Sequence, residues 1–169
     1  MPVFLSGVPL HVLVVHAVVV LVPLAVLATL TIALWPAARR RYGWVAVAVT
    51  AAATVAVPLA TSSGEDLRDR LAPTDLIRQH AHLGDELLVF VAGLLVVSAG
   101  LVWFDRRVRS EAPGAARRVP SRPVTIGLAA LTVTLAAVSA VQVVRIGDSG
   151  ARAAWAQTHY VAPRHEGGD

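Results

Sequence analysis

Two histidines interrupt the first long apolar stretch of the sequence. His11 and His16 lie within VPLHVLVVHAVVVLVPL (8–24), where almost every other side chain is hydrocarbon. Imidazole is a metal ligand and a proton carrier, and an ionisable side chain within a membrane segment is a functional candidate by default. Because five residues of a regular helix turn through about 140°, the two histidines do not share a helix face. One of them is expected to point into a helical bundle while the other points elsewhere.

A second histidine pair lies in the stretch RQHAHLGDEL (78–87). His82 and Glu86 are four residues apart, a helical spacing at which a carboxylate can orient an imidazole. Gly84 follows His80 by four residues, and a glycine one turn away leaves room for a bulky group against the helix. His80 is therefore the candidate ligand of this stretch, and His82 with Glu86 is its candidate support.

The elements that must position these residues are membrane helices. The chain has a mean hydropathy of +0.64 and is 56% hydrophobic but only 5% aromatic, so its apolar content is mainly Ala, Val and Leu, which a bilayer can solvate. A hydrocarbon core takes about 20 apolar residues as helix. We expect an all-α integral membrane protein, an antiparallel four-helix bundle forming one domain over 1–150, with an extracytoplasmic tail over 151–169. Its predicted spans are 9–35, 43–63, 83–104 and 123–147.

Arginine placement predicts the orientation of these helices. The Lys and Arg total is 15, and all are Arg. Nine of them fall in the connections 36–44 and 105–122, which the positive-inside rule places in the cytoplasm. Both termini are then extracytoplasmic, and the protein belongs in a bacterial cell membrane. Trp35, Trp44 and Trp103 suit an aromatic belt at the inner interface. Nucleic acid is not an expected partner, because the arginines are explained by topology.

The predicted orientation gathers the candidate residues on the outer side. Counting about 20 residues from each cytoplasmic helix end defines one layer near the outer interface, with His11 and His80 about one turn further out. Arg145 is the expected partner of the carboxylates in this layer. The layer contains His16, Glu65, Asp85, Glu86 and Arg145.

Two local signals predict helix ends on this side. Thr74 is a candidate N-cap for the third helix, with Asp75 in its first turn. The segment Gly147 to Gly150 is expected to end the fourth helix, since glycine is favoured where helices terminate.

Several stretches together resemble the bacterial membrane family called domain of unknown function 2231. They are GVPLHVLVVHAVVVLVPLA (7–25), SGEDL (63–67), RQHAHLGDEL (78–87) and RIGDSGARAAW (145–155). The chain departs from the family pattern at Val12, where a proline is usual, and at Asp148, where a histidine is common. The family is similar in plan to small four-helix b-type cytochromes, and related chains are joined to Rieske-type modules. The resemblance thus implies electron transfer, by analogy of fold.

The first functional hypothesis is a membrane b-type haem protein that transfers electrons near the extracytoplasmic face. His16 and His80 would be the axial ligands of one haem b, with His11 able to replace or support His16, and Arg145 would pair a propionate. The sequence has no Cys, which excludes covalent c-type attachment. No catalytic residue is assigned, and the expected partners are the lipid bilayer and an extracytoplasmic redox protein or quinol.

Two alternatives remain open at this point. A non-haem site for Zn, Fe or Mn could use His16, His80 or His11, with the nearby polar residues either orienting these imidazoles or serving as alternative ligands. An accessory subunit that braces a respiratory complex would need neither haem nor metal. The nearby polar residues are Glu65, Asp85, Glu86 and His82.

Overall fold

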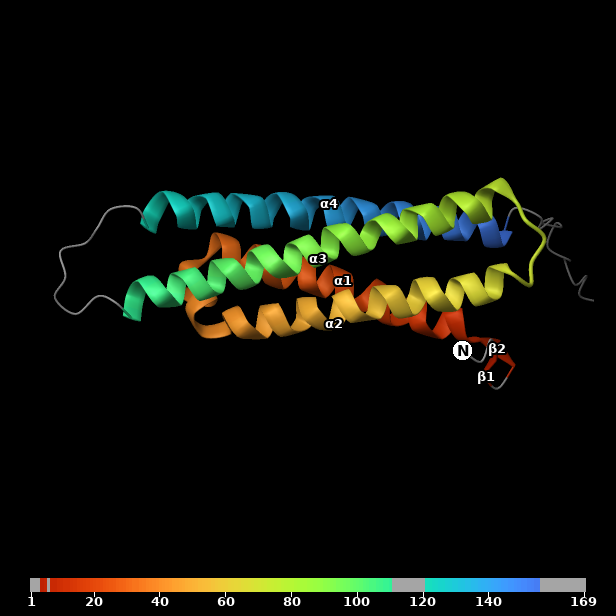
Figure 1. Cartoon of the computed structure of the whole chain (residues 1–169), viewed down its shortest axis with the longest axis horizontal. Helices are drawn as coiled ribbons and strands as arrows, with labels where there is room; N and C mark the ends of the chain where they lie inside the picture. The colour runs from red at the N-terminus through yellow and green to blue at the C-terminus, as the bar shows by residue number, and fades with distance from the viewer. Residues whose placement is uncertain (1–3, 6, 111–120, 156–169) are drawn as a thin grey trace, which may run out of the picture.

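Four long helices make up almost all of the computed structural model, which describes residues 4–5, 7–110 and 121–155 (Figure 1). A short β-hairpin with two residues in each strand precedes them, with β1 (Phe4–Leu5) antiparallel to β2 (Val8–Pro9). Gly7 has a φ of +83° in the connection between these strands, a conformation that favours glycine. The helices are α1 (Leu10–Leu34), α2 (Pro36–Arg68), α3 (Asp75–Ser110) and α4 (Ser121–Trp155).

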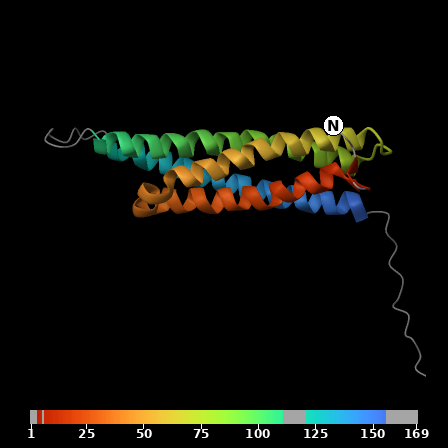
Figure 2. The ribbon, with the colours of Figure 1, turned by 90° about the horizontal axis from the view of Figure 1, so that it is seen from below.

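The helices form an antiparallel bundle. Each packs mainly against its sequence neighbours and α4 closes the ring against α1, so that α1 and α3 lie on a diagonal. Figure 2 shows the same bundle from below, with the strands, the α2–α3 connection and the end of α4 at one end. The predicted all-α four-helix membrane fold is confirmed.

Helix length and surface composition fit a bilayer. The helices have 25, 33, 36 and 35 residues, whereas about 20 span the hydrocarbon core, so α2, α3 and α4 extend beyond it. Large apolar side chains cover the outside of the bundle: Val20 is 63% exposed, Leu27 63%, Val96 70% and Val144 71%. All four helices are long and apolar enough to cross a membrane, and these side chains contact lipid.

Small residues let the helices approach closely. Ala25 and Ala53 are completely buried in the largest core cluster, together with Val22. Near the other end of the bundle, a Cβ on Gly43 would lie 2.9 Å from both methyl groups of Val102. This glycine therefore permits the contact between α2 and α3.

The two opposite ends of the bundle differ in their polar residues. The histidine end contains His11 and His80, near the starts of α1 and α3. The arginine end contains Arg39, Asp105 and Arg109.

The predicted start of α3 is confirmed. Thr74 lies just before the first helical residue, Asp75, and its Oγ1 accepts a hydrogen bond from the backbone N–H of Ile77 at 3.2 Å. This is an N-cap interaction, which satisfies one of the N–H groups left unpaired at a helix start.

Two predicted helix boundaries were wrong, the start of α2 and the end of α4. Only Trp35 separates α1 from α2, because Pro36 is favourable at the first turn of a helix and the arginines 39–41 continue as helix rather than loop. The α4 helix continues through 147–150 to Trp155, since glycine lowers helix propensity without forcing a helix to end.

Candidate site: a histidine pair at one end of the bundle

His11 and His80 face each other across the diagonal of the bundle. Their ring centroids are 6.4 Å apart and their planes meet at 84°. Both side chains are half-buried. The rings come from α1 and α3, so the packing of the whole bundle, rather than local sequence, brings them together.

Helix α2 fixes the His11 ring. Nδ1 of His11 lies 3.0 Å from the carbonyl oxygen of Ala60 and 3.4 Å from Oγ of Ser63. The Ser63 hydroxyl donates to the same carbonyl at 2.9 Å. Because a carbonyl oxygen can only accept, Nδ1 of the neutral ring carries the proton and Nε2 is the nitrogen with a free lone pair. A Cβ on Gly64 would lie 3.0 Å from Cε1 of His11, so this ring packs directly on the helix backbone.

Helix α4 fixes the His80 ring in the same way. Nδ1 of His80 lies 3.1 Å from Oγ of Ser149. The Ser149 hydroxyl donates to the carbonyl oxygen of Ile146 at 2.9 Å, so the Ser149 oxygen is left to accept from Nδ1–H of His80. A Cβ on Gly150 would lie 3.0 Å from Cε1 of His80.

The two halves of the site therefore have the same construction. In each helical hairpin, a histidine near the start of the first helix packs on a Ser-Gly pair in the second: Ser63-Gly64 for His11 and Ser149-Gly150 for His80. These four supporting residues were not predicted as part of the site. Their signal was the dipeptide Ser-Gly, which recurs near the C-terminal ends of α2 and α4.

The structure pairs His11, rather than His16, with His80. His16 is exposed, with Nδ1 near the carbonyl of Val12 in the preceding turn, whereas His11 meets His80. Residue counting estimated depth along the helix, but the five-residue spacing places the two rings on different faces. His11 is therefore the α1 member of the pair.

The predicted contact between His82 and Glu86 is present, with Nδ1 of His82 3.3 Å from Oε1. In the described part of the chain the other partner of Glu86 is Gln142, whose Nε2 donates to Oε2 at 2.7 Å, and not the predicted Arg145. Gly84 faces Cγ2 of Thr61 on α2.

The remaining predicted site residues lie around the pair rather than in it. Glu65, Asp85 and Arg145 are exposed side chains at this end of the bundle. His159 and His165 lie outside the described residues. Among the residues that the structure describes, no group of three or more His, Asp or Glu side chains could hold a metal ion. The protein side chains that converge are thus two imidazoles.

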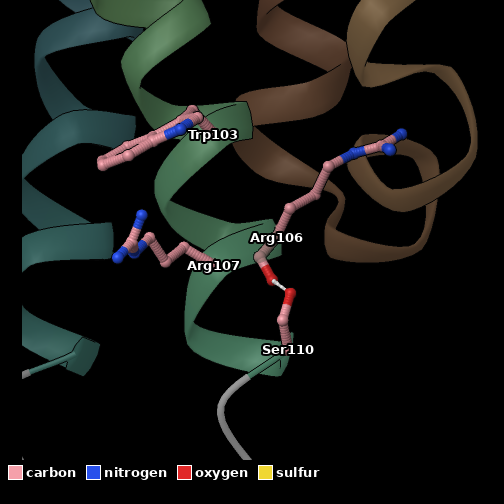
Figure 3. Close-up of a pocket in the computed structure, with 4 residues that line it drawn as sticks. All are labelled: Trp103, Arg106, Arg107 and Ser110. Carbon is pink, nitrogen blue, oxygen red and sulfur yellow. Dashed lines mark hydrogen bonds between the residues drawn. The ribbon is translucent and has the colours of Figure 1, made fainter.

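The arginine end has a different character. A hollow of about 330 Å³ there is lined by Trp103, Arg106, Arg107 and Ser110. Figure 3 shows Arg107 beside Trp103, while Arg106 extends towards the α1–α2 connection. The guanidinium carbon of Arg107 lies 5.5 Å from the centre of the Trp103 ring, and that of Arg106 lies 5.9 Å from the Trp44 ring. Arginine and tryptophan together are typical of a membrane–water interface.

Fold and site together define a four-helix membrane protein with one histidine from each hairpin paired near one end. The chain belongs to the family described as Predicted membrane protein (DUF2231), whose profile matches residues 7–163. Neither the curated proteins nor the solved structures contain a match to it.

Proposed function

We propose that this protein is a membrane cytochrome of the b type, in which Nε2 of His11 and Nε2 of His80 hold one haem iron from opposite sides. Imidazoles on facing helices are common haem ligands in helical bundles. A metal atom bound at about 2.0–2.1 Å by two opposed imidazole nitrogens places the ring centroids roughly 6 Å apart. The separation of 6.4 Å between these rings is the observation that carries the proposal.

The hydrogen bonds to Nδ1 support this assignment. Histidines that ligate a metal almost always donate their other ring N–H to a nearby acceptor, which fixes the tautomer and the ring orientation. The Ala60 carbonyl serves His11 in this way, and the Ser149 hydroxyl oxygen serves His80. Both rings are thereby oriented with Nε2 available for coordination.

The donor set also favours haem over a bare metal ion. A structural or catalytic Zn site takes three or four protein ligands, whereas the described residues bring together only two imidazoles at this position. A porphyrin supplies four further nitrogen ligands, so two histidines complete six-coordinate iron. The alternative Zn, Fe or Mn site would need donors beyond Glu65, Asp85, Glu86 and His82, none of which joins the pair.

Bound haem would supply one-electron redox chemistry. With both axial positions taken by His11 and His80, no position is open for oxygen or substrate, so the role is electron transfer rather than bond chemistry. Arg145, exposed at the same end, would pair a propionate. Under the positive-inside rule the arginine end is cytoplasmic. The histidine end then faces outward in a bacterial cell membrane, towards an extracytoplasmic redox partner.

Three single substitutions in the purified full-length chain test the proposal. His11→Ala and His80→Ala should each abolish the Soret absorption band and the bound haem. His16→Ala is the matched control, because His16 is an exposed histidine on the same helix, and it should keep both.

Three results would overturn the proposal. One is a full Soret band in either His11→Ala or His80→Ala. Another is a colourless wild-type protein with stoichiometric Zn, Fe or Mn, which would instead support the metal-ion site. The third is a colourless and metal-free protein, which would support an accessory subunit.

A further inference from the structure

A groove of about 330 Å³ lies between α3 and α4, apart from the histidine pair. Glu86 in its lining follows His80 by six residues, which corresponds to a rise of about 9 Å along a helix. The groove is therefore close to the proposed haem without being part of its ligand set. Its lining residues are Glu86, Phe90, Ala137, Val138, Val141, Gln142 and Arg145.

One end of the groove carries a connected set of polar groups. Gln142 is only 4% exposed, and its Nε2 donates to Oε2 of Glu86 at 2.7 Å. The other carboxylate oxygen lies 3.3 Å from Nδ1 of His82, whose side chain is 75% exposed. Glu86 thus presents a hydrogen-bond acceptor to the groove and is linked through an imidazole to water.

The rest of the groove is apolar and faces the lipid. Phe90 contributes an aromatic ring from α3, and α4 contributes small and branched aliphatic side chains. Val141 on this surface is 59% exposed. Because the outside of the bundle contacts the bilayer, a ligand reaches this groove from within the membrane.

We propose that the groove binds the head group of a membrane quinol, with one hydroxyl donating a hydrogen bond to Glu86 and the ring lying against Phe90. A quinol is neutral, flat and dissolved in lipid, and it carries hydroxyl donors that match a carboxylate acceptor. A phospholipid phosphate could pair with Arg145 but would also lie beside the Glu86 carboxylate, whereas a neutral quinol meets no like charge. The proposal rests on the proposed function for its purpose, since a quinol would be the electron donor to the haem.

The proton and electron balance uses residues of this groove. Oxidation of one quinol to its quinone breaks two O–H bonds and releases two protons and two electrons. Glu86 would accept the proton of the hydroxyl bonded to it and release it to water, and the second proton would pass directly to water. The haem of the proposed function would accept one electron, pass it to the extracytoplasmic redox partner and then accept the second.

A photoreactive azido-quinone with a short alkyl tail, applied to the full chain in lipid nanodiscs, tests the binding directly. Cross-links should map to the α3 and α4 peptides that contain Phe90 and Val141, and excess unlabelled decyl-quinol should compete. Ala137→Phe fills the groove and should reduce labelling about tenfold. Val144→Phe adds the same ring to α4 at a lipid-facing position, 71% exposed, and should label like the wild type. Glu86→Gln should weaken competition by the quinol several-fold more than competition by the quinone.

Two results would overturn the groove assignment. One is equal labelling of Ala137→Phe and Val144→Phe, and the other is competition by added phosphatidylglycerol but not by quinol. The haem assignment is tested separately, by the Soret absorption of the same samples. His80→Ala protein that has lost its Soret band should still be labelled. A wild-type protein that contains haem but is not labelled refutes only the groove. A colourless wild-type protein that is labelled refutes only the haem.

Discussion

At the residue scale, one acceptor beside each ring determines which nitrogen of each histidine is free. The Ala60 carbonyl accepts from His11 and the Ser149 hydroxyl oxygen accepts from His80, which leaves the Nε2 atoms available to the proposed haem. The Ala60 contact has no sequence signature, because any residue supplies a carbonyl. The neighbouring Ser-Gly pairs are visible in the sequence, but their use depends on which helices pack together.

The glycines under the rings give a prediction at this scale. In Gly150→Ala the new Cβ would lie 3.0 Å from Cε1 of His80, so the ring must shift and we expect haem affinity to fall by about tenfold. Gly147→Ala is the control, since nothing lies within 4 Å of a Cβ there. That substitution should keep the haem and stabilise α4 by about 0.5–1 kcal/mol. Haem titration and denaturant unfolding of both variants check this, and equal haem affinity in the two would contradict it.

At the element scale, the number and type of helices could be predicted from the sequence, but their orientation about their own axes could not. Four apolar runs of sufficient length predicted the spans, and Thr74 predicted the start of α3. The α1 helix is apolar on all sides, so its sequence does not reveal which face meets the bundle. Packing was therefore needed to decide between His11 and His16.

Charged and polar contacts at the arginine end connect α1, α2 and α3. Asp105, near the end of α3, has a side chain only 10% exposed, and Arg39 on α2 is 5% exposed. Nε of Arg39 lies 3.4 Å from Oδ1 of Asp105 without good hydrogen-bond geometry, so the attraction is chiefly Coulombic. Arg39 also donates to the carbonyl of Ile32 in α1 at 3.3 Å, and Arg109 donates to Asp105.

Loss of that carboxylate charge should therefore destabilise the bundle. We expect Asp105→Asn to lower the free energy of unfolding by about 3 kcal/mol, because it leaves a buried guanidinium without its counter-charge. Asp75→Asn removes the same charge from an exposed pair with Arg78, where Asp75 is 93% exposed, and should cost about 1 kcal/mol or less. Denaturant unfolding in detergent compares the two variants. A similar loss of unfolding free energy in both would show that the Asp105 charge does not stabilise the bundle.

At the scale of the whole molecule, the arginine distribution predicts how the bundle sits in the membrane. The sequence has no Cys, so single-cysteine variants carry no background label. Leu71→Cys, in the exposed α2–α3 connection at the histidine end, should react with an impermeant maleimide added to intact cells. Ala37→Cys, exposed at the start of α2, should react only after the membrane is opened. The reverse pattern would place the histidine end in the cytoplasm and refute the proposed partner side.

The angle between the two rings gives the most direct test of the central claim. If His11 and His80 are the axial ligands of one haem and keep their interplanar angle of 84°, the ferric protein should be low-spin with nearly perpendicular axial imidazoles. Its frozen-solution electron paramagnetic resonance spectrum should then show a strongly anisotropic low-spin signal dominated by one low-field feature, and this signal should be absent from His11→Ala and His80→Ala. A rhombic three-line signal would contradict the perpendicular pair. A high-spin signal, or no haem signal in protein purified from haem-replete cells, would contradict the bis-histidine site itself.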